Sequence, residues 1–279
     1  MSEPVGAVDR RALRVTVADE VAEVTLLGPG KHNAMGPDFW RELPEVFAEL
    51  DADPAVRAVV VTGSGSNFSV GLDIPEMRGL FDVVLGERAL AAARADLHRE
   101  IVRMQASINA VADCRKPVIA AVHGVCYGGG VDLIAAADIR YACSGAKFSV
   151  RETRIAIVAD VGALQRLPAL IGDGHVRELA FTGRDIDAAR AQSIGLVNDV
   201  FPDQRSTLRA ARATAREIAG NPPLVVHGVK EVLGRHRAAT IDEGLRYVAA
   251  WNAAFLPSED LSEALRALDE GRPARFTGQ

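Results

Sequence analysis

The sequence has few cysteines, and their arrangement excludes two kinds of scaffold. There are 3 cysteines in 279 residues, Cys114, Cys126 and Cys143. An odd number with no C-x-x-C spacing indicates neither a disulfide framework nor a zinc site. A chain of this length can bury a substantial core without such cross-links. We therefore expect a globular protein of about one to two domains, without a bound metal.

Long apolar runs and an excess of positive charge are also lacking. No stretch reaches the roughly 18 consecutive apolar residues that span a bilayer, and residues 1–11 lack the apolar run of a signal peptide. The C-terminal Phe276-Thr-Gly-Gln differs from a peroxisomal S-K-L signal. A formal net charge of -5 gives no general attraction to nucleic acid. These absences predict a cytoplasmic protein that binds neither membranes nor nucleic acid.

The hydrophobic patterning predicts an α/β fold that ends in helices. Apolar and polar residues alternate over 13–17 and 21–27, as in a half-buried hairpin. The continuous apolar runs at 58–62 and 117–122 are typical of strands covered on both faces. Helical spacing is found over 37–50 and 83–112, and helix-forming segments dominate after residue 201. We expect a core over residues 1–201 and a helical subdomain over 202–279.

A glycine-rich loop follows each of the two predicted core strands. The second of these loops contains Gly128-Gly129-Gly130 and opens an apolar helix, and successive glycines let a ligand approach the backbone closely. The first N–H groups of a helix have no acceptor within it, so this turn can hold an anion or an oxyanion. The alternative is that the glycines only permit a tight turn. The motif matches neither a P-loop nor a serine-hydrolase elbow.

The two loops together resemble those of the crotonase, or enoyl-coenzyme-A hydratase/isomerase, superfamily. In that family one backbone N–H from each loop forms an oxyanion hole, and Leu72 and Gly129 stand at the matching positions. The similarity extends from Lys31-His-Asn-Ala-Met to Gly195-Leu-Val-Asn, which is most of the chain. The resemblance implies a crotonase-like spiral of ββα repeats. It also implies a C-terminal helical region that packs subunits into trimers, often paired as hexamers.

The resemblance further implies the ligand. The expected substrate is an acyl-coenzyme-A thioester, so coenzyme A arrives as part of the substrate and no separate cofactor is needed. Lys31 is expected near the coenzyme A phosphates, and Lys230 of a neighbouring subunit is a second candidate, for which a solvated lysine is the alternative. The residues at the family's substrate-binding positions are Lys31, His32, Ala34, Gly71, Leu72, Asp73, Ile74, Gly129 and Gly130.

Three acidic residues are candidates for proton transfer. Asp132 lies in the first helical turn after the glycines, Glu152 follows 20 residues later, and Asp160 interrupts an otherwise uncharged stretch. Burial of such a carboxyl would raise its pKa toward the range useful for proton transfer. Helix capping is the alternative for Asp132, and for Asp160 at a helix expected to begin near Gly162.

The same three acids indicate the reaction. Hydratases of the family use two glutamates at the positions of Asp132 and Glu152, and typically have no acid at that of Asp160. All three acids match the dienoyl-coenzyme-A isomerases of the family, which remove a proton at C2 and deliver one at C6. The resemblance implies that Glu152 and Asp160 exchange these protons, in an order left open, and that Asp132 orients Asp160.

Several alternatives to an isomerase are open. One is a hydratase, and another is a catalytically silent relative that binds acyl-coenzyme A or RNA. A silent protein would have no use for three carboxylates, and RNA binding would require a basic face that the composition does not indicate. Arg151 and Arg154 flank Glu152 and would lower its pKa if they pointed into the pocket. The main hypothesis is an isomerase of 3,5-dienoyl-coenzyme A in unsaturated fatty-acid β-oxidation.

Overall fold

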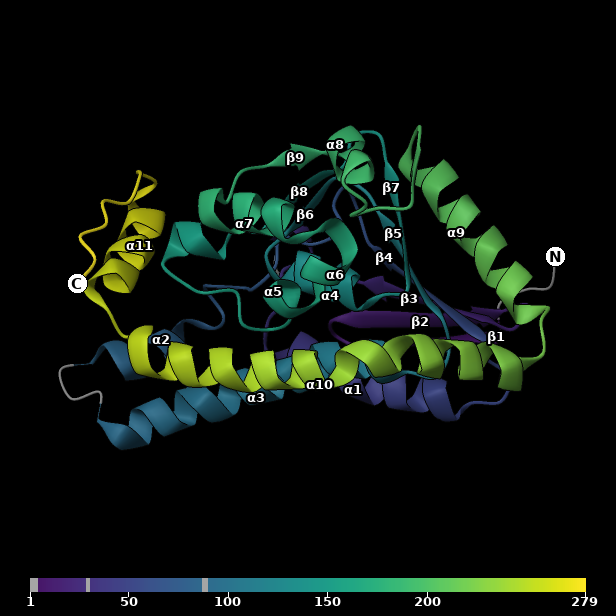
Figure 1. Ribbon diagram of the computed structural model, residues 1–279, viewed down its shortest axis with the longest axis horizontal. Coiled ribbons are helices and arrows are strands. Elements are labelled where there is room, and N and C mark those ends of the chain that lie inside the picture. The colour runs from purple at the N-terminus through teal and green to yellow at the C-terminus, as the bar shows by residue number, and fades with distance from the viewer. Residues whose placement is uncertain (1–4, 29–30, 87–89) are drawn as a thin grey trace.

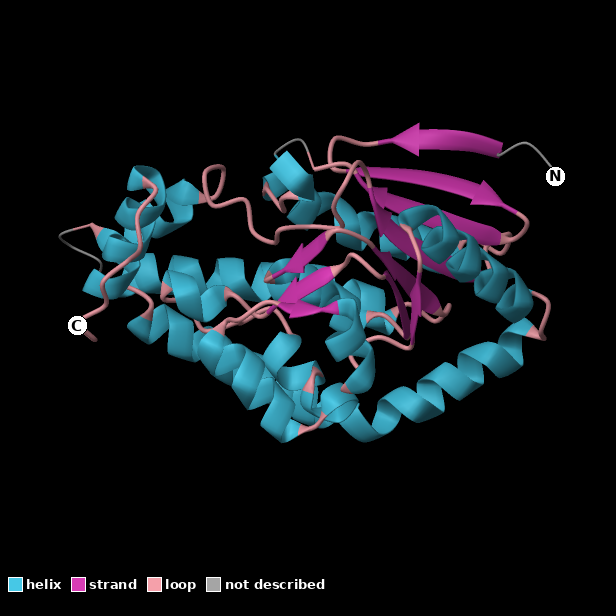
Figure 2. Ribbon diagram, turned by 90° about the horizontal axis from the view of Figure 1, so that it is seen from above, coloured by secondary structure: helices cyan, strands magenta, loops and turns pink. Residues whose placement is uncertain are grey.

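The computed structural model describes residues 5–28, 31–86 and 90–279. Figure 1 shows the longest helix, α10 (Pro223–Phe255), running along the lower edge beside α3 (Ala91–Asp113), which it contacts. The larger sheet lies behind α9 (Gln204–Ala219), and the two chain ends lie at opposite ends of the molecule. In Figure 2, seen from above, the strands gather on one side and most helices on the other.

The larger sheet has seven strands in the order β1-β2-β3-β4-β5-β7-β10. β2 and β3 form the predicted antiparallel hairpin, and every pair from β3 onward is parallel. β4 and β5 are buried along their whole length, as their continuous apolar runs predict. The strands are β1 (Val5–Asp9), β2 (Leu13–Ala18), β3 (Val21–Leu26), β4 (Ala58–Gly63), β5 (Val118–Val122), β7 (Ile139–Cys143) and β10 (Asp199–Phe201).

In a smaller sheet the central strand β8 (Lys147–Ser149) pairs with β6 (Val125–Tyr127) on one side and with β9 (Ile186–Asp187) on the other. The chain passes from the larger sheet to the smaller one at Gly124, which separates β5 from β6. Gly124 has φ +57, and a Cβ there would lie 2.0 Å from the carbonyl oxygen of Ser66. Only glycine fits this crossing, which directs β6 toward the glycine turn.

The helices cover both faces of the larger sheet. α1 (Pro37–Ala52) buries the predicted stripe that includes Phe39 and Phe47, and it continues through Pro44. On the other face, alanines of α9 pack against Val60 and Ile119 in a second, smaller core. The remaining helices are α2 (Arg78–Leu85), α4 (Gly129–Ala136), α5 (Ala163–Arg166), α6 (Pro168–Ile171), α7 (Asp173–Thr182), α8 (Ala188–Ser193), α11 (Glu259–Glu270) and the 3-10 turns η1 (Lys31–Asn33) and η2 (Glu152–Ile155).

The single helix predicted over 83–112 is wrong. The structure has two helices there, because α2 ends at Leu85 and α3 begins at Ala91. Gly86 closes α2 with an extended backbone, at φ -63 and ψ 154. Glycine has little preference for the helical conformation, so the chain leaves the helix at this residue.

The C-terminal part of the described chain is helical, as predicted. After β10 the elements are α9, α10 and α11. α10 contacts α3 and α5, and α11 contacts η2. The predicted boundary between residues 201 and 202 stays a prediction, and α9 shares a core with the sheet. No helix among residues 5–28, 31–86 and 90–279 has the length and apolar character needed to cross a membrane.

Candidate active site

The two glycine loops meet at the N-terminus of α4. A Cβ on Gly71 would lie 2.8 Å from the backbone nitrogen of Gly129, and a Cβ on Gly129 would lie 3.7 Å from that of Leu72. Within the described part of the chain, neither the Leu72 N–H nor the Gly129 N–H donates a hydrogen bond. Two donors from separate loops therefore lie side by side without a hydrogen-bond acceptor among the described residues, and such a pair of N–H groups can stabilise an oxyanion.

Asn33 holds the first of these loops in place. Its Nδ2 donates to the carbonyl oxygens of Ser64, Asn67 and Phe68 at 2.9, 2.8 and 3.1 Å. Its Oδ1 accepts from the Ser64 hydroxyl at 2.9 Å. The sequence motif contains Asn33, but its bracing role could not be assigned, because the loop it holds lies more than 30 residues away.

The predicted substrate-binding residues differ in their exposure. Lys31 and His32 are exposed, and the His32 ring nitrogen Nδ1 lies 2.7 Å from the Asn67 amide. Ala34 and Asp73 are buried, and Ile74 is half-buried against the core. The other members of the predicted set are Gly71, Leu72, Gly129 and Gly130, and their binding roles stay predictions.

Replacement of Gly71 should open the arrangement of the two donors. A Cβ at Gly71, with φ +83, would meet both the Gly129 nitrogen and the Tyr127 carbonyl oxygen at 2.8 Å. We expect Gly71→Ala to lower kcat/KM by about 10²-fold or more, the usual cost of losing an oxyanion donor. Gly65→Ala is the control, because Gly65 has a similar φ of +64 but open space around it. Equal activity of the two variants would contradict a role in catalysis for the paired N–H groups of Leu72 and Gly129.

The three acids converge beside this turn from α4, η2 and the segment before α5. Glu152 Oε1 would lie 3.4 Å from a Cβ on Gly128. Asp132 interacts electrostatically with both Glu152 and Asp160, and Glu152 interacts with Asp160. Asp132 is fully buried, whereas Glu152 and Asp160 keep part of their surface exposed. The structure thus brings together all three acids that the sequence singled out.

Asp132 caps a helix, although not its own. Its Oδ1 accepts from the Ala163 N–H at 2.5 Å, at the start of α5. Its Oδ2 is buried without a hydrogen-bond partner among the described residues. Burial raises the pKa of Asp132 well above its usual range, and the Glu152 charge raises it further. This carboxyl therefore anchors the chain just beyond Asp160.

Glu152 has a pKa near neutral pH. Burial raises its pKa to about 7, and the neighbouring Asp160 adds to the rise. Arg151 turns away, because its Nη2 pairs with Asp185 at 2.8 Å and its Cζ lies 4.0 Å above the Tyr127 ring. Arg154 packs against Gly183. The two guanidinium groups are therefore not among the causes that lower the pKa of Glu152, although the backbone of Arg151 is one of them.

Asp160 does not cap α5, so that alternative is wrong. The N-cap of α5 is Gly162, with no side-chain hydrogen bond. Asp160 Oδ2 instead accepts from Asn252 Nδ2 at 2.7 Å. Burial raises the pKa of Asp160 to about 6, while the Asn252 hydrogen bond works in the opposite direction. Asn252 lies 92 residues further along the chain, and no motif indicated it.

The raised pKa of Glu152 makes the stability of the fold depend on pH. A carboxyl whose pKa is about 7 when folded, against 4.5 ordinarily, stabilises the fold fully below pH 4.5 and loses this contribution as pH rises through 7. The free energy of unfolding of Glu152→Gln should rise relative to that of wild type as the pH increases from 4.5 to 8. We expect the difference between the two proteins to grow by up to about 3 kcal/mol. Urea denaturation across this range measures it. Parallel pH curves for the two proteins would contradict the burial of this charge.

Lys230 is not a solvated surface lysine, which was one of its two interpretations from the sequence. Its Nζ donates to Asp138 Oδ2 at 2.7 Å and to the Lys116 carbonyl oxygen at 3.1 Å. The alternative of a solvated lysine is therefore wrong, because this ammonium group ties α10 to the residues just before β5 and just before β7 in its own chain.

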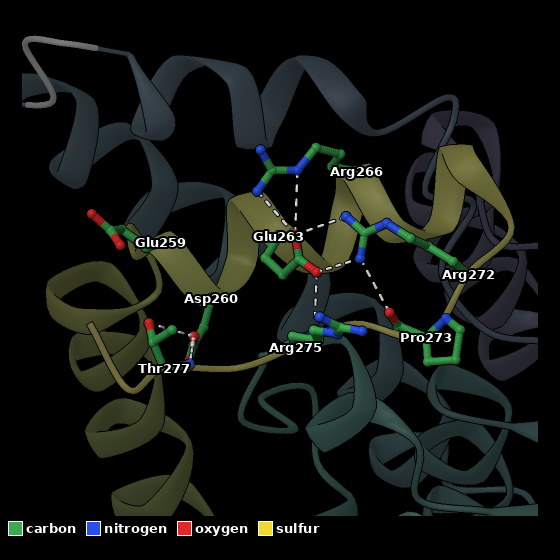
Figure 3. Close-up of a pocket in the computed structure, with 8 residues that line it drawn as sticks. All are labelled: Glu259, Asp260, Glu263, Arg266, Arg272, Pro273, Arg275 and Thr277. Atoms are coloured by element: carbon green, nitrogen blue, oxygen red, sulfur yellow. Dashed lines mark hydrogen bonds and ion pairs between the residues drawn. The ribbon is translucent and has the colours of Figure 1, made fainter.

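A surface pocket near the C-terminus is lined by none of the three acids. Figure 3 shows Glu263 at its centre, bound by Arg266 and Arg272 and by the backbone of Arg275. The Glu263 carboxylate accepts from Arg266 Nη2 at 2.9 Å, Arg272 Nη2 at 3.0 Å and Arg275 N at 3.0 Å. This network fastens the C-terminal segment to α11, and we assign it no chemistry.

Metal binding is not indicated by the geometry. Over residues 5–28, 31–86 and 90–279, no group of three or more His, Cys, Asp or Glu side chains is arranged to hold a metal ion. The expectation that the protein needs no metal and no separate cofactor stays a prediction.

Comparison with known proteins identifies the family. Residues 16–279 match the family model described as enoyl-CoA hydratase/isomerase. The chain belongs to this family. An enoyl-CoA hydratase/isomerase from Mycobacterium paratuberculosis has a similar crystal structure, with TM-score 0.80 and 29% identity over 92% of this chain and 98% of that one. The α/β crotonase fold expected from the sequence is confirmed.

Two curated relatives are more specific. A mitochondrial Delta(3,5)-Delta(2,4)-dienoyl-CoA isomerase of Dictyostelium discoideum is 42% identical over 96% of this chain and 92% of its own. A peroxisomal protein of the same name from Arabidopsis thaliana is 40% identical over 95% of each chain. The resemblance to the dienoyl-CoA isomerases of the family is thereby confirmed.

The prediction of a cytoplasmic protein is wrong. The similar isomerases are named as mitochondrial and peroxisomal proteins. The prediction rested on the absence of recognisable signals at the two ends of the chain, and such an absence does not decide where a protein resides.

Proposed function

We propose that this protein is an isomerase that converts 3,5-dienoyl-coenzyme A into 2,4-dienoyl-coenzyme A in the oxidation of unsaturated fatty acids. The observation that carries the proposal is the convergence of Asp132, Glu152 and Asp160 beside two unsatisfied backbone donors. Similar proteins that carry the name dienoyl-CoA isomerase support it.

The proposed reaction removes one proton at C2, adds one at C6 and changes no oxidation state. The thioester oxygen accepts hydrogen bonds from the N–H groups of Leu72 and Gly129. One carboxylate removes a proton from C2, and the electrons spread over a dienolate whose negative oxygen these donors stabilise. A second carboxyl delivers a proton to C6, which leaves double bonds at C2 and C4. Glu152 and Asp160 perform these two transfers, because their pKa values of about 7 and about 6 suit both giving and taking protons.

Asp132 acts through position in this scheme. Its bond to the Ala163 N–H fixes the chain that follows Asp160, and its neutral form avoids a third buried negative charge. Lys31, which is exposed, is proposed to meet the phosphates of the coenzyme A part of the substrate.

The activity is tested with purified protein and ultraviolet absorbance. Conjugation of the diene with the thioester changes the spectrum, so 3,5-dienoyl-coenzyme A should be converted without any added cofactor. The 2-enoyl-coenzyme A thioester serves as the comparison substrate. Hydration of the enoyl substrate with no turnover of the dienoyl substrate would overturn the isomerase assignment in favour of a hydratase.

The proposal includes self-association as a trimer or a hexamer. Support comes from α10, which exposes many large apolar side chains although it is 33 residues long and packed on α3 along part of its length. Its exposed apolar residues are Leu224, Val225, Val229, Val232, Leu233, Tyr247, Trp251 and Phe255. Light scattering after size-exclusion chromatography should give three or six chain masses, and a monomer at micromolar concentration would contradict this.

A further inference from the structure

The side chain of Asp160 is hydrogen-bonded to the side-chain amide of Asn252 on α10. Asn252, on α10, is 1% exposed. Its Nδ2 donates to Asp160 Oδ2 at 2.7 Å and to the Val158 carbonyl oxygen at 2.8 Å. The carbonyl of Val158 can only accept, so the amide must present its NH₂ group, and both of its hydrogens are used. The orientation of Asn252 is thus fixed by its two acceptors.

A second amide holds the main chain of the same residue. Gln105, on α3, donates from Nε2 to the Asp160 carbonyl oxygen at 2.7 Å and to the Leu245 carbonyl oxygen at 3.0 Å. Gln105 is buried as well. Asp160 is therefore held at its backbone by α3 and at its carboxyl by α10, and only the second contact touches the group that would carry a proton.

We propose that Asn252 is a positioning residue for the isomerase reaction, which confines the exchangeable proton of Asp160 to Oδ1 and fixes how this carboxyl meets the substrate. This inference rests on the proposed function. Oδ2 accepts from Asn252, and a proton placed on Oδ2 would weaken that hydrogen bond, because the hydroxyl oxygen of a carboxylic acid is a poorer acceptor than its carbonyl oxygen. Proton transfer at one defined oxygen favours a constant geometry with the substrate carbon.

The charges around Asp160 make Asn252 the main stabiliser of its ionised form. Burial disfavours a negative charge on Asp160, and the acids that interact with it are Glu152 on η2 and Asp132 on α4. Arg166 of α5 interacts electrostatically with Asp132 and with Asp242 of α10. The hydrogen bond from Asn252 is the side-chain contact that lowers the pKa of Asp160.

The test replaces Asn252 by Leu, which keeps the size and removes the donor. Carbon-13 NMR of aspartate-labelled protein, with the Asp160 signal assigned by its absence in Asp160→Asn, follows this carboxyl directly. We expect Asn252→Leu to raise its titration midpoint by roughly one to two pH units, and to move one limb of the kcat profile by the same amount. The value of kcat should fall about tenfold or more, with KM little changed.

Gln105→Leu is the matched control. It removes a buried amide that also ties α3 to α10, but it leaves the carboxyl contact intact. We expect it to lower stability without moving the Asp160 titration. An unmoved midpoint in Asn252→Leu, or equal shifts in both variants, would overturn the inference. A shifted midpoint with an unchanged kcat profile would also overturn it. Absence of isomerisation by the wild-type protein would overturn the proposed function and this role together, whatever the titration shows.

Discussion

Replacement of Asp160 by Asn should lower kcat for isomerisation by about 10³-fold or more while the protein stays folded. The amide has nearly the same size as the carboxyl, but it can neither accept nor release a proton at the pH of the assay. Asp160 faces a hydrogen-bond donor on α10 and two acids of the same site, so the loss falls on proton transfer rather than on packing.

The stability of Asp160→Asn separates chemistry from folding. Because burial raises the pKa of the carboxyl to about 6, removal of its charge should leave the unfolding free energy at pH 8 equal to or above that of wild type. Asp113→Asn is a suitable control, since burial also raises the pKa of that acid at the end of α3. A fully active Asp160→Asn enzyme would reduce Asp160 to a structural residue.

Replacement of Glu152 by Gln should have an effect of similar size. Glu152 Oε1 lies beside the glycine turn, and Oε2 is buried without a partner in the part of the chain that the structure describes. A group with a pKa of about 7 exchanges protons readily at physiological pH, whereas the Gln amide does not. We expect kcat to fall by about 10³-fold, measured by ultraviolet absorbance at saturating dienoyl substrate.

The control for Glu152→Gln is another buried glutamate. Glu42 is 4% exposed and accepts hydrogen bonds from the backbone N–H groups of Arg11 and Ala12 at 3.2 and 2.9 Å. Glu42→Gln should lose stability, because an amide is a poorer acceptor for these donors, and should retain kcat in the folded fraction. Comparable losses of kcat in both variants would indicate that Glu152 acts only through the fold.

The parts of the candidate site that could be predicted from the sequence are those whose residues lie in local motifs. Leu72 and Gly129 follow recognisable glycine loops, and strand order then brings the two loops together. The acids were found because a charge in an apolar stretch requires a reason, as at Asp160. Their meeting at one place follows from how α4, η2 and α5 pack, which no single motif contains.

The contacts that the sequence could not predict join residues far apart in the chain. Asn252 reaches Asp160 across 92 residues, and its choice of partner depends on how α10 lies against α3. Arg151 would lower the pKa of Glu152 if it pointed into the pocket, but its guanidinium group instead donates to Asp185, 34 residues later. Gly86 broke a helix whose periodicity alone continued through it. In each case tertiary packing overrode a local signal.

The measurement that tests the central claim most directly is proton exchange in deuterium oxide, followed by NMR of both substrate and product. Wild-type protein should form 2,4-dienoyl-coenzyme A that carries deuterium at C6. If Glu152 and Asp160 serve different carbons, one of the variants Glu152→Gln and Asp160→Asn should still exchange the C2 hydrogens of unreacted substrate, above the rate without protein, and the other should not. Exchange at C2 by both variants, or product without deuterium at C6 when the protein is equilibrated in deuterium oxide, would contradict proton transfer by two separate carboxyl groups.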